Sequence, residues 1–429
     1  MTCFDCRPIW CKLQPYGFTG FFFFALLAGL AFSENGAKQA HGLSETKNPG
    51  QQAADEPLKI SSMITMFMCG DVMIGRGIDQ VLPHPADPLI HEQYMKSARG
   101  YVELAEKANG PVQQPVSYAY IWGDALKELE RAAPDVRIIN LETSVTRSDN
   151  FGKKKTIHYR MNPENTSCLT AAKIDFCSLA NNHILDWGYS GLEETLESLQ
   201  KVNVRSAGAG QDLQDAEAPA VIEVEGKGRV IVFSYGLETS GIPLDWSASE
   251  EKPGVNFLKD SSDETILNIK HKVVEVKQKG DIVVASIHWG SNWGYRIPSD
   301  QVKLAHKLID DGSVDVIHGH SSHHVKGIEV YKHKLILYGC GDFLNDYEGI
   351  GGYEDFRADL GLMYFVSVSP LTGKLVRLQM IPTQIKRLRV NRATRADAVW
   401  SRDILNREGE QFGTRVELDR DNSLTLQWD

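Results

Sequence analysis

The sequence predicts an α/β fold in which a largely parallel sheet is packed between helices. Seven short apolar runs each end abruptly in polar or ionisable residues, and amphipathic helical patterns lie between several of them. Apolar runs of this length are typical of strands buried on both faces, and alternation of strands with helices favours parallel pairing. The 429 residues are 42% hydrophobic and 24% charged, as in folded domains. The runs span residues 63–69, 136–139, 174–180, 230–233, 282–287, 314–317 and 335–337.

The first 60 residues are expected to lie outside this fold. Arg7 and Lys12 precede the apolar run 18–32, which is the order of an export signal, and the run is shorter than the roughly 20 residues that span a bilayer comfortably. We predict that residues 1–32 form a signal peptide or an uncleaved signal-anchor; a cytosolic apolar N-terminus is the alternative. Residues 33–60 read as a flexible polar linker. The protein is therefore expected to be exported or membrane-anchored, and extracytoplasmic, with its N-terminus as the membrane contact.

Three helices between the strand runs have recognisable starts. Ser190 and Glu193 match a capping box ahead of a leucine-lined face. Ser261 and Glu264 repeat this pattern, and Ser299 opens a third amphipathic segment. These segments predict helices that cover the sheet.

The pattern changes towards the C-terminus. Residues 360–368 and 375–381 alternate in polarity and predict an antiparallel hairpin. A helix is expected over 396–411, and a last short hairpin over 415–428. We therefore predict a main domain at 61–390, and a C-terminal extension at 391–429 made of a helix and a hairpin.

Composition and missing motifs exclude several classes of function. The net charge is −10 and no basic stripe with interleaved aromatic residues occurs, so nucleic acid is not expected as a partner. The chain has no Gly-x-Ser-x-Gly elbow and no phosphate-binding P-loop, which argues against a serine hydrolase and a P-loop ATPase. Seven cysteines are too few and too scattered for a disulfide scaffold. Cys69 and Cys340 are expected to be buried core residues, although an exported location would permit a disulfide between body cysteines.

Side chains that can bind metal ions follow five of the apolar runs. Ligands in layered α/β folds gather at the carboxyl ends of the strands, so these side chains are expected to meet at one edge of the sheet. Carboxylate, amide and imidazole groups together are typical metal ligands. The sequence therefore predicts a metal-centred site. Its members at the strand ends include Asp71, Glu142, Asn182, His183, His288, His320 and His323.

The segment 318–324 is the strongest single signal, since it holds four histidines in seven residues. His320 and His323 could both reach one cation, or one could bind metal while the other contacts substrate. His318 is expected to belong to the strand itself. Asp186 lies three residues after His183 and could orient its ring. For His183 and His288 taken singly, a half-buried histidine with ordinary hydrogen bonds is the alternative.

The order of these motifs resembles the bacterial capsule synthesis family called CapA or PGA_cap, over residues 63–343. This family belongs to the calcineurin-like metallophosphoesterase superfamily. The resemblance implies a four-layer αββα sandwich, here with a C-terminal β-rich extension, and a role in making, anchoring or exporting poly-γ-glutamate. The segments that carry it are Gly70-Asp71-Val-Met-Ile-Gly75-Arg76, Asn140-Leu-Glu142, Asn181-Asn-His183, His288-Trp-Gly290, Gly319-His320-Ser-Ser-His323 and Tyr338-Gly-Cys-Gly-Asp342-Phe343.

The resemblance also implies roles for individual residues. It implies one or two divalent metal ions, with manganese, zinc, magnesium and iron all open. The implied metal ligands are Asp71, Glu142 at the bridging position, Asn182, His288 and His320. The implied catalytic residues are His183 as proton donor, with Arg76 and His323 stabilising negative charge. Asp186 and Asp342 are expected to orient these residues through hydrogen bonds without binding the metal themselves.

Several positions depart from the superfamily pattern and leave two functions open. Met73 stands where a histidine is usual, Glu142 where the bridging residue is aspartate, and Asp342 where asparagine is common. The first function is a metal-dependent hydrolase acting on a phosphate- or glutamate-containing substrate. The second is a non-catalytic component that binds, anchors or exports an anionic polymer. We favour the hydrolase, because a binding protein has little need for such a cluster of ionisable residues.

Overall fold

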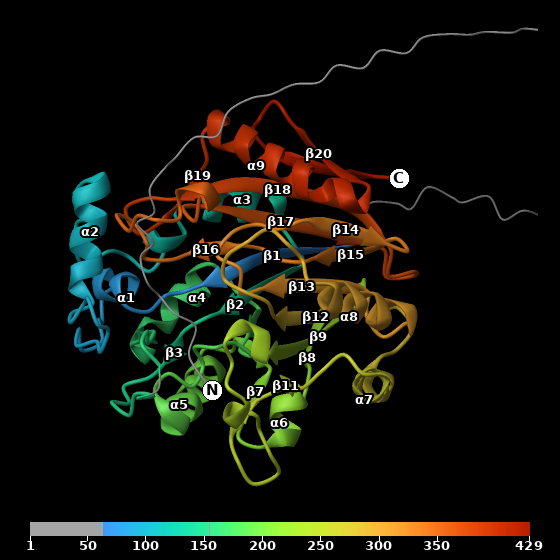
Figure 1. The fold of residues 1–429 in the computed structure, drawn as a ribbon, viewed down its shortest axis with the longest axis horizontal. Coiled ribbons are helices and arrows are strands. Elements are labelled where there is room, and N and C mark those ends of the chain that lie inside the picture. Colours follow the sequence, from blue (N-terminus) through green and yellow to red (C-terminus); the bar gives the residue numbers. More distant parts are fainter. Residues whose placement is uncertain (1–62, 154) are drawn as a thin grey trace, which may run out of the picture. The chain divides into compact units, whose positions relative to one another are not determined.

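Two sheets form the centre of the protein, and helices cover their outer faces (Figure 1). The computed structural model describes residues 63–153 and 155–429. The predicted leader (1–32) and linker (33–60) lie outside the described residues. Within the described part of the chain, no helix is long and apolar enough to cross a membrane.

The first sheet has ten strands and is built around β1 (Ile64–Val72). On one side of β1 the strands are parallel: β2 (Val136–Leu141), β5 (Phe176–Ser178) and β6 (Arg205–Ala207). On the other side they are antiparallel: β17 (Leu360–Val368), β18 (Leu375–Ile385), β21 (Leu424–Trp428) and β20 (Thr414–Leu418). Two short strands lie off this path, β16 (Asp342–Leu344) beside β1 and β19 (Val390–Arg392) beside β18. The expectation of a largely parallel sheet therefore holds for only half of this one.

The second sheet has seven strands and a parallel centre. Its strands are β8 (Ala220–Val224), β9 (Gly228–Leu237), β11 (Phe257–Leu258), β12 (Ile282–His288), β13 (Val316–His320), β14 (Ile328–Tyr331) and β15 (Lys334–Leu337). Strands β9, β12, β13 and β15 run parallel, and β8 and β14 add antiparallel edges. Two small two-stranded pairs are β3 (Ser144–Val145) with β4 (Arg160–Met161), and β7 (Ala209–Gly210) with β10 (Gly254–Val255).

Alternate residues of the central strands enter different cores. Met66 and Met68 of β1 pack in the core between the two sheets, whereas Phe67 and Cys69 pack in the core under the helices. This follows from the two-residue period of a strand. A third core joins the outer face of the second sheet to helices α7 (Asp263–Val276) and α8 (Ser299–Asp310). Helix, sheet, sheet and helix therefore form four layers, which confirms the predicted αββα sandwich.

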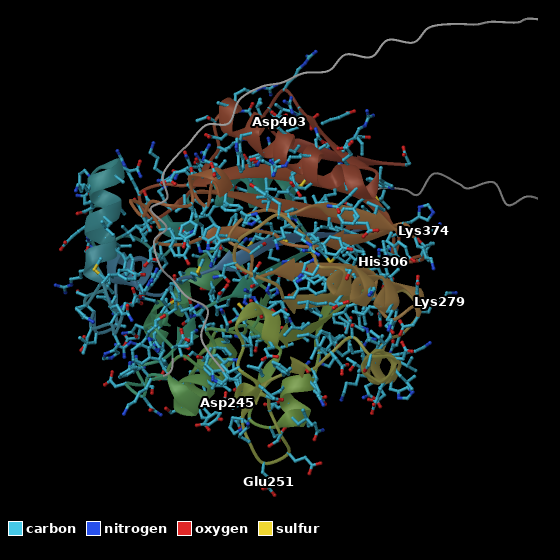
Figure 2. All side chains as sticks on the ribbon, in the orientation of Figure 1. Asp245, Glu251, Lys279, His306, Lys374 and Asp403 are labelled. Carbon is cyan, nitrogen blue, oxygen red and sulfur yellow. The ribbon has the colours of Figure 1, made fainter. Side chains whose placement is uncertain are left out.

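The remaining helices lie around the sheets, and charged residues such as Lys279, Lys374 and Asp403 project outward (Figure 2). These helices are α1 (Gly77–Val81), α2 (Arg99–Asn109), α3 (Ala125–Ala132), α4 (Ser167–Ala171), α5 (Gly188–Lys201), α6 (Leu213–Glu217) and α9 (Arg395–Gly409). Helix α9 and the hairpin β20–β21 form where a C-terminal helix and hairpin were predicted. Because β21 pairs with β18, residues 391–429 extend the first sheet.

Two of the predicted helix starts need correction. The box at Ser190 is wrong, because α5 begins at Gly188 and the Ser190 hydroxyl lies 3.0 Å from that of Ser148. Helix α7 is capped one residue later than predicted, by Ser262. The Ser262 hydroxyl accepts a hydrogen bond from the backbone N–H of Thr265 at 3.3 Å. Helix α8 begins at Ser299 as predicted.

The cysteines of the described chain are all free and buried, namely Cys69, Cys168, Cys177 and Cys340. This confirms the expectation that Cys69 and Cys340 are core residues.

Candidate metal centre

Strand register places the predicted side chains at one edge of the two sheets. Asp71 at the end of β1 is in register with Asn140 on β2 and with Asp342 on β16. A side chain at Gly70 would put its Cβ 1.8 Å from the carbonyl oxygen of Gly341. Only glycine therefore permits the close approach that brings Asp71 to Asp342.

In the second sheet, neighbouring parallel strands carry two of the predicted ligands. His288 ends β12 and is in register with His320, which ends β13. Their Nδ1 atoms lie 2.8 Å apart, and the Nε2 atom of His320 lies 2.9 Å from the Ser286 hydroxyl. The Nε2 atom of His288 is buried and has no hydrogen-bond partner in the part of the chain that the structure describes.

Two groups of buried residues have the spacing of metal ligands, and they share Asp71. Asp71, His288 and His320 form one group; Asp71, His323 and Asp342 form the other. Within each group the ligand atoms all lie within 4.8 Å of one another. A carboxylate common to two groups can bridge two metal ions. The sequence predicts the bridging role for Glu142 and a supporting role for Asp342, and both stay predictions; the structure adds that the two groups share Asp71 and that one of them includes Asp342.

Glu142 and Asn182 lie next to these groups. An oxygen of Glu142 is 3.9 Å from His288 Nε2 and 3.7 Å from His183 Nε2. The side-chain oxygen of Asn182 is buried and has no hydrogen-bond partner within residues 63–153 and 155–429. The Asn140 amide, which sequence reasoning did not assign to the site, donates to Asp71 at 2.7 Å and to Glu142 at 3.4 Å. Asn140 thus holds the two carboxylates together.

Burial and crowding disfavour negative charge on the carboxyl groups of this cluster. Burial and then the charge of Asp342 raise the pKa of Asp71 to about 7, from an ordinary value of 3.8. Burial and then the charge of Asp71 raise the pKa of Glu142 well above its usual range. Burial also lowers the pKa values of His288 and His320, which keeps both rings neutral. Neutral imidazoles and crowded carboxylates are the state that a divalent cation binds.

The residues present therefore fit a metal ion. Buried polar atoms almost always have hydrogen-bond partners, yet Asn182 Oδ1 and His288 Nε2 have none among the described residues. Both are oxygen or nitrogen donors of the kind that manganese, zinc and iron accept. The buried histidines and carboxylates can hold a metal.

His183 lies beside the ligand groups in a network of its own. Its Nδ1 is 2.6 Å from a carboxylate oxygen of Asp186, which is the contact expected of Asp186. Lys155 donates to the other oxygen of Asp186 at 2.6 Å and lies 3.1 Å from His183 Nδ1. Burial is the main cause that lowers the pKa of His183, to about 4. Sequence reasoning missed Lys155, because a short lysine run usually marks a solvated loop.

Arg76 is buried and already has anionic partners. Two of its nitrogens donate to Asp346, and a third donates to Glu92 at 2.9 Å and to the Tyr101 hydroxyl at 3.0 Å. Its guanidinium also lies over the ring of Tyr159, 4.4 Å from the centroid. Two carboxylates would therefore compete with a substrate anion for Arg76, and its predicted contact with substrate stays a prediction.

Met73 is fully buried at the position where the resemblance implies a histidine. The Tyr347 hydroxyl donates to its sulfur at 3.8 Å, and the Tyr159 hydroxyl donates to Tyr347 at 3.4 Å. The Tyr159 ring packs edge-on against His183 at 4.7 Å, and the Tyr347 ring against His323 at 5.5 Å. Neither tyrosine follows an apolar strand run, so the sequence pattern did not reveal them.

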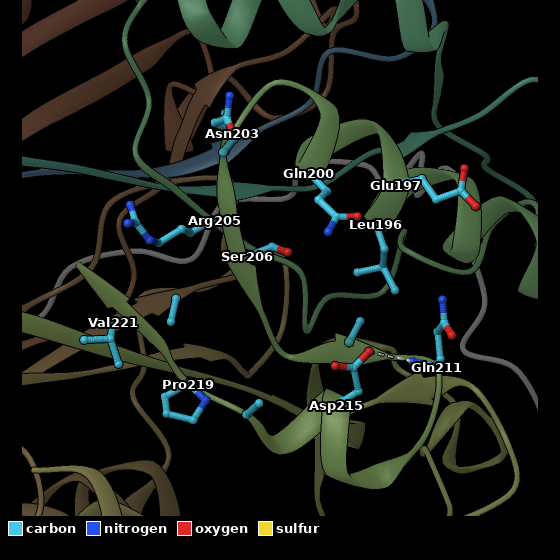
Figure 3. Close-up of a pocket in the computed structure, with 14 residues that line it drawn as sticks. Leu196, Glu197, Gln200, Asn203, Arg205, Ser206, Gln211, Asp215, Pro219 and Val221 are labelled. Carbon is cyan, nitrogen blue, oxygen red and sulfur yellow. Dashed lines mark hydrogen bonds between the residues drawn. The ribbon is translucent and has the colours of Figure 1, made fainter. Parts of the chain in front are cut away.

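A hollow of about 800 Å³ lies elsewhere, at the edges of the two sheets (Figure 3). It is lined by residues of α5, β6 and β8 and by the segment around Asp215. None of the predicted site residues lines it, so the candidate centre is separate from it.

Comparison with known proteins identifies the family of this chain. Residues 65–347 match the model of the family described as bacterial capsule synthesis protein PGA_cap. The chain belongs to this family. It is 46% identical to a probable polyglutamine synthesis accessory protein of Mycobacterium tuberculosis, over 85% of this chain and 96% of that protein. It is 24% identical to the capsule biosynthesis protein CapA of Bacillus anthracis, over 66% of this chain and 60% of that protein.

Two further proteins are similar to parts of this chain. The PGA biosynthesis protein CapA of Bacillus subtilis is 31% identical over 48% of this chain and 52% of its own length. Among solved structures, a novel phosphatase of Mycoplasma pneumoniae aligns with a TM-score of 0.40 and 13% identity, over 75% of this chain and 93% of that one.

Proposed function

We propose that this PGA_cap family member is a hydrolase that depends on two divalent metal ions and acts in the synthesis of capsule or poly-γ-glutamate. The observation that carries the proposal is the pair of buried ligand groups that share Asp71. The names of the relatives, which refer to capsule, PGA and polyglutamine synthesis, support the pathway. From the leader pattern of residues 18–32, we propose an extracytoplasmic location.

Different residues of the protein would hold the metal ions and transfer the proton in such a reaction. When bound, a metal ion lowers the pKa of water to about 7 and polarises the bond to be broken. Asp71, His288, His320, His323 and Asp342 would hold the ions, with Glu142 and Asn182 beside them.

Proton transfer is assigned to His183. Asp186 holds its Nδ1 at 2.6 Å, so the Nε2 atom is left to exchange a proton with the reacting group. Lys155 fixes Asp186 in turn, at 2.6 Å. The substrate is proposed to carry phosphate or glutamate groups.

The test uses the full-length protein, first stripped of metal and then reloaded with Mn²⁺, Zn²⁺, Mg²⁺ or Fe²⁺. Phosphomonoesters, phosphodiesters and a γ-glutamyl peptide are assayed beside a His183→Ala variant. We expect metal-dependent turnover that falls by at least about 100-fold in the variant, the size typical of a lost proton-transfer group. Turnover that is equal in the variant would refute the assignment of His183.

A second function is favoured by one observation. Met73 is a buried thioether where the superfamily pattern has a histidine ligand, and a thioether is a poor ligand for hard cations. This favours a non-catalytic component that binds an anionic polymer through the same metal centre. Metal binding without turnover on any substrate of the panel would support this second function.

A further inference from the structure

We propose that Tyr159 and Tyr347 form a hydroxyl pair that binds an anionic oxygen of the substrate, next to the metal centre. The proposal rests on the proposed hydrolase site and adds two residues to it that contact the substrate. The ligand is defined by its chemistry, as a phosphoryl or carboxylate oxygen.

The position of the pair supports this assignment. The Tyr159 ring contacts the proposed proton-transfer residue, His183, at 4.7 Å, and the Tyr347 ring contacts the proposed ligand His323 at 5.5 Å. The two hydroxyls lie 3.4 Å apart. They therefore connect the two sides of the centre, where a reacting group would have to sit between proton donor and metal ligands.

The hydrogen bonds of these hydroxyls are weak. Hydroxyl–hydroxyl hydrogen bonds are usually 2.7–2.8 Å long, but Tyr159 and Tyr347 are separated by 3.4 Å. Tyr347 accepts this bond and donates its own hydrogen to the Met73 sulfur at 3.8 Å, and a thioether is a weak acceptor. Purely structural buried tyrosines normally have a good partner. Tyr338, whose hydroxyl donates to Glu329 at 2.6 Å, is one example in this chain.

Met73 is the reason that the Tyr347 hydroxyl lacks a strong hydrogen bond. A histidine at this position would bind metal and accept or donate a strong hydrogen bond, whereas methionine leaves Tyr347 without one. The departure at Met73 thus replaces one metal ligand with a weak acceptor, so that the Tyr347 hydroxyl can turn to a substrate oxygen instead.

Arg76 strengthens both donors without contacting the substrate. Its guanidinium lies 4.4 Å from the Tyr159 ring centroid and 5.9 Å from that of Tyr347. A cation over the ring face draws electron density from the hydroxyl oxygen into the ring, which makes each hydroxyl a better donor. Arg76 would then act on an anion through the tyrosines, since its own nitrogens are occupied by Asp346 and Glu92.

The experiment measures anion binding by the Mn²⁺-loaded full-length protein, using inorganic phosphate and glutarate as separate probes in calorimetric titrations. Tyr159→Phe and Tyr347→Phe are compared with the parent, and bound manganese is counted in each. We expect each variant to bind one of the two anions about tenfold more weakly, because each loses a hydrogen bond to a charged oxygen. The manganese content should not change. The anion that is affected identifies the substrate group.

The matched control is Tyr101→Phe. Tyr101 also lies against Arg76, at 3.9 Å, but its hydroxyl bonds to Glu92. This variant should lower the melting temperature and leave anion affinity unchanged. If Tyr159→Phe fails to fold, the half-buried Tyr347 provides the decisive variant, since its ring contacts remain.

Affinities within twofold of the parent for both anions would overturn the hydroxyl pair, as would a parent that binds neither. Failure of the hydrolase is a separate outcome: a parent with no turnover on any substrate refutes the enzyme. In that case the anion titrations still decide the pair. If turnover is lost in His183→Ala and anion binding is unchanged in the two Phe variants, the hydrolase stands and the hydroxyl pair is refuted.

Discussion

Replacement of Asp342 by asparagine should have opposite effects on the metal-free and the metal-loaded protein. Asp342 and Asp71 have carboxylate oxygens within 4.8 Å of each other, and both residues are fully buried. Without metal their charges repel. At pH 8, above the pKa of about 7 of Asp71, the Asp71 carboxylate carries charge. Asparagine removes one of the two charges and keeps the shape of the side chain.

The magnitude follows from the geometry. Two unit charges 4.8 Å apart repel by about 3 kcal/mol at the effective dielectric constant of about 20 that suits protein sites. The change also weakens the hydrogen bond between Asp342 and His323, which is 2.8 Å long, and this costs about 1 kcal/mol. The net gain in metal-free stability is about 2 kcal/mol, which raises the melting temperature by about 3 °C for a chain of this length.

With manganese present, the order should reverse. Asparagine is a weaker ligand than a carboxylate for such cations, so the second ligand group loses affinity. The variant should bind one ion where the parent binds two, and manganese should raise its melting temperature by less. Metal counting and thermal unfolding at pH 8, with and without manganese, measure both effects.

The control is Asp346→Asn. Asp346 is equally buried, but Arg76 already neutralises its charge. This variant should lose stability with and without metal and keep the parent's metal content. The reasoning would be refuted by a metal-free Asp342→Asn protein that melts below the parent, or by one that still binds two ions.

Further predictions concern the same centre and the fold around it. Because the pKa of Asp71 is about 7 in the folded metal-free protein and 3.8 is its ordinary value, this group destabilises the fold progressively as pH rises from about 4 to 7. Metal displaces that proton, so manganese affinity should fall by about tenfold for each pH unit below 7, with protons released on binding in calorimetry. Arg76→Met should cost about 3–5 kcal/mol in urea unfolding, with or without metal, because it leaves buried carboxylates unpaired. Gly70→Ala should abolish metal binding in metal counting, since the added Cβ would meet the Gly341 carbonyl at 1.8 Å; normal metal content would contradict the strand approach described above. Removal of residues 391–429 should yield insoluble protein in expression tests, because it strips β21 from β18 and uncovers their core.

The positions of the ligands along the strands could be predicted from the sequence. Apolar runs define buried strands locally, so the residue that ends a run is known without the fold. His288 and His320 end β12 and β13 as expected, and they lie side by side because these strands are parallel neighbours. The same reasoning predicted the hairpin of β17 and β18, whose alternating polarity reflects the period of a strand.

The approach of Asp342 to Asp71 could not be predicted in this way. Asp342 joins Asp71 only because β16 pairs with the end of β1, and that pairing depends on the contact between Gly70 and Gly341. A local pattern contains no information about which loop returns to which strand.

The sequence by itself therefore determined the kinds of residue in the centre, the strands that carry them and the family to which the chain belongs. The tertiary structure alone decided which of these side chains share Asp71, that carboxylates surround Arg76, and that Tyr159 and Tyr347 meet beside Met73. The physical reason is the range of each effect. Periodicity and burial act over a few neighbouring residues, whereas the geometry of a metal centre depends on strand order and on close contacts between segments that are distant along the chain.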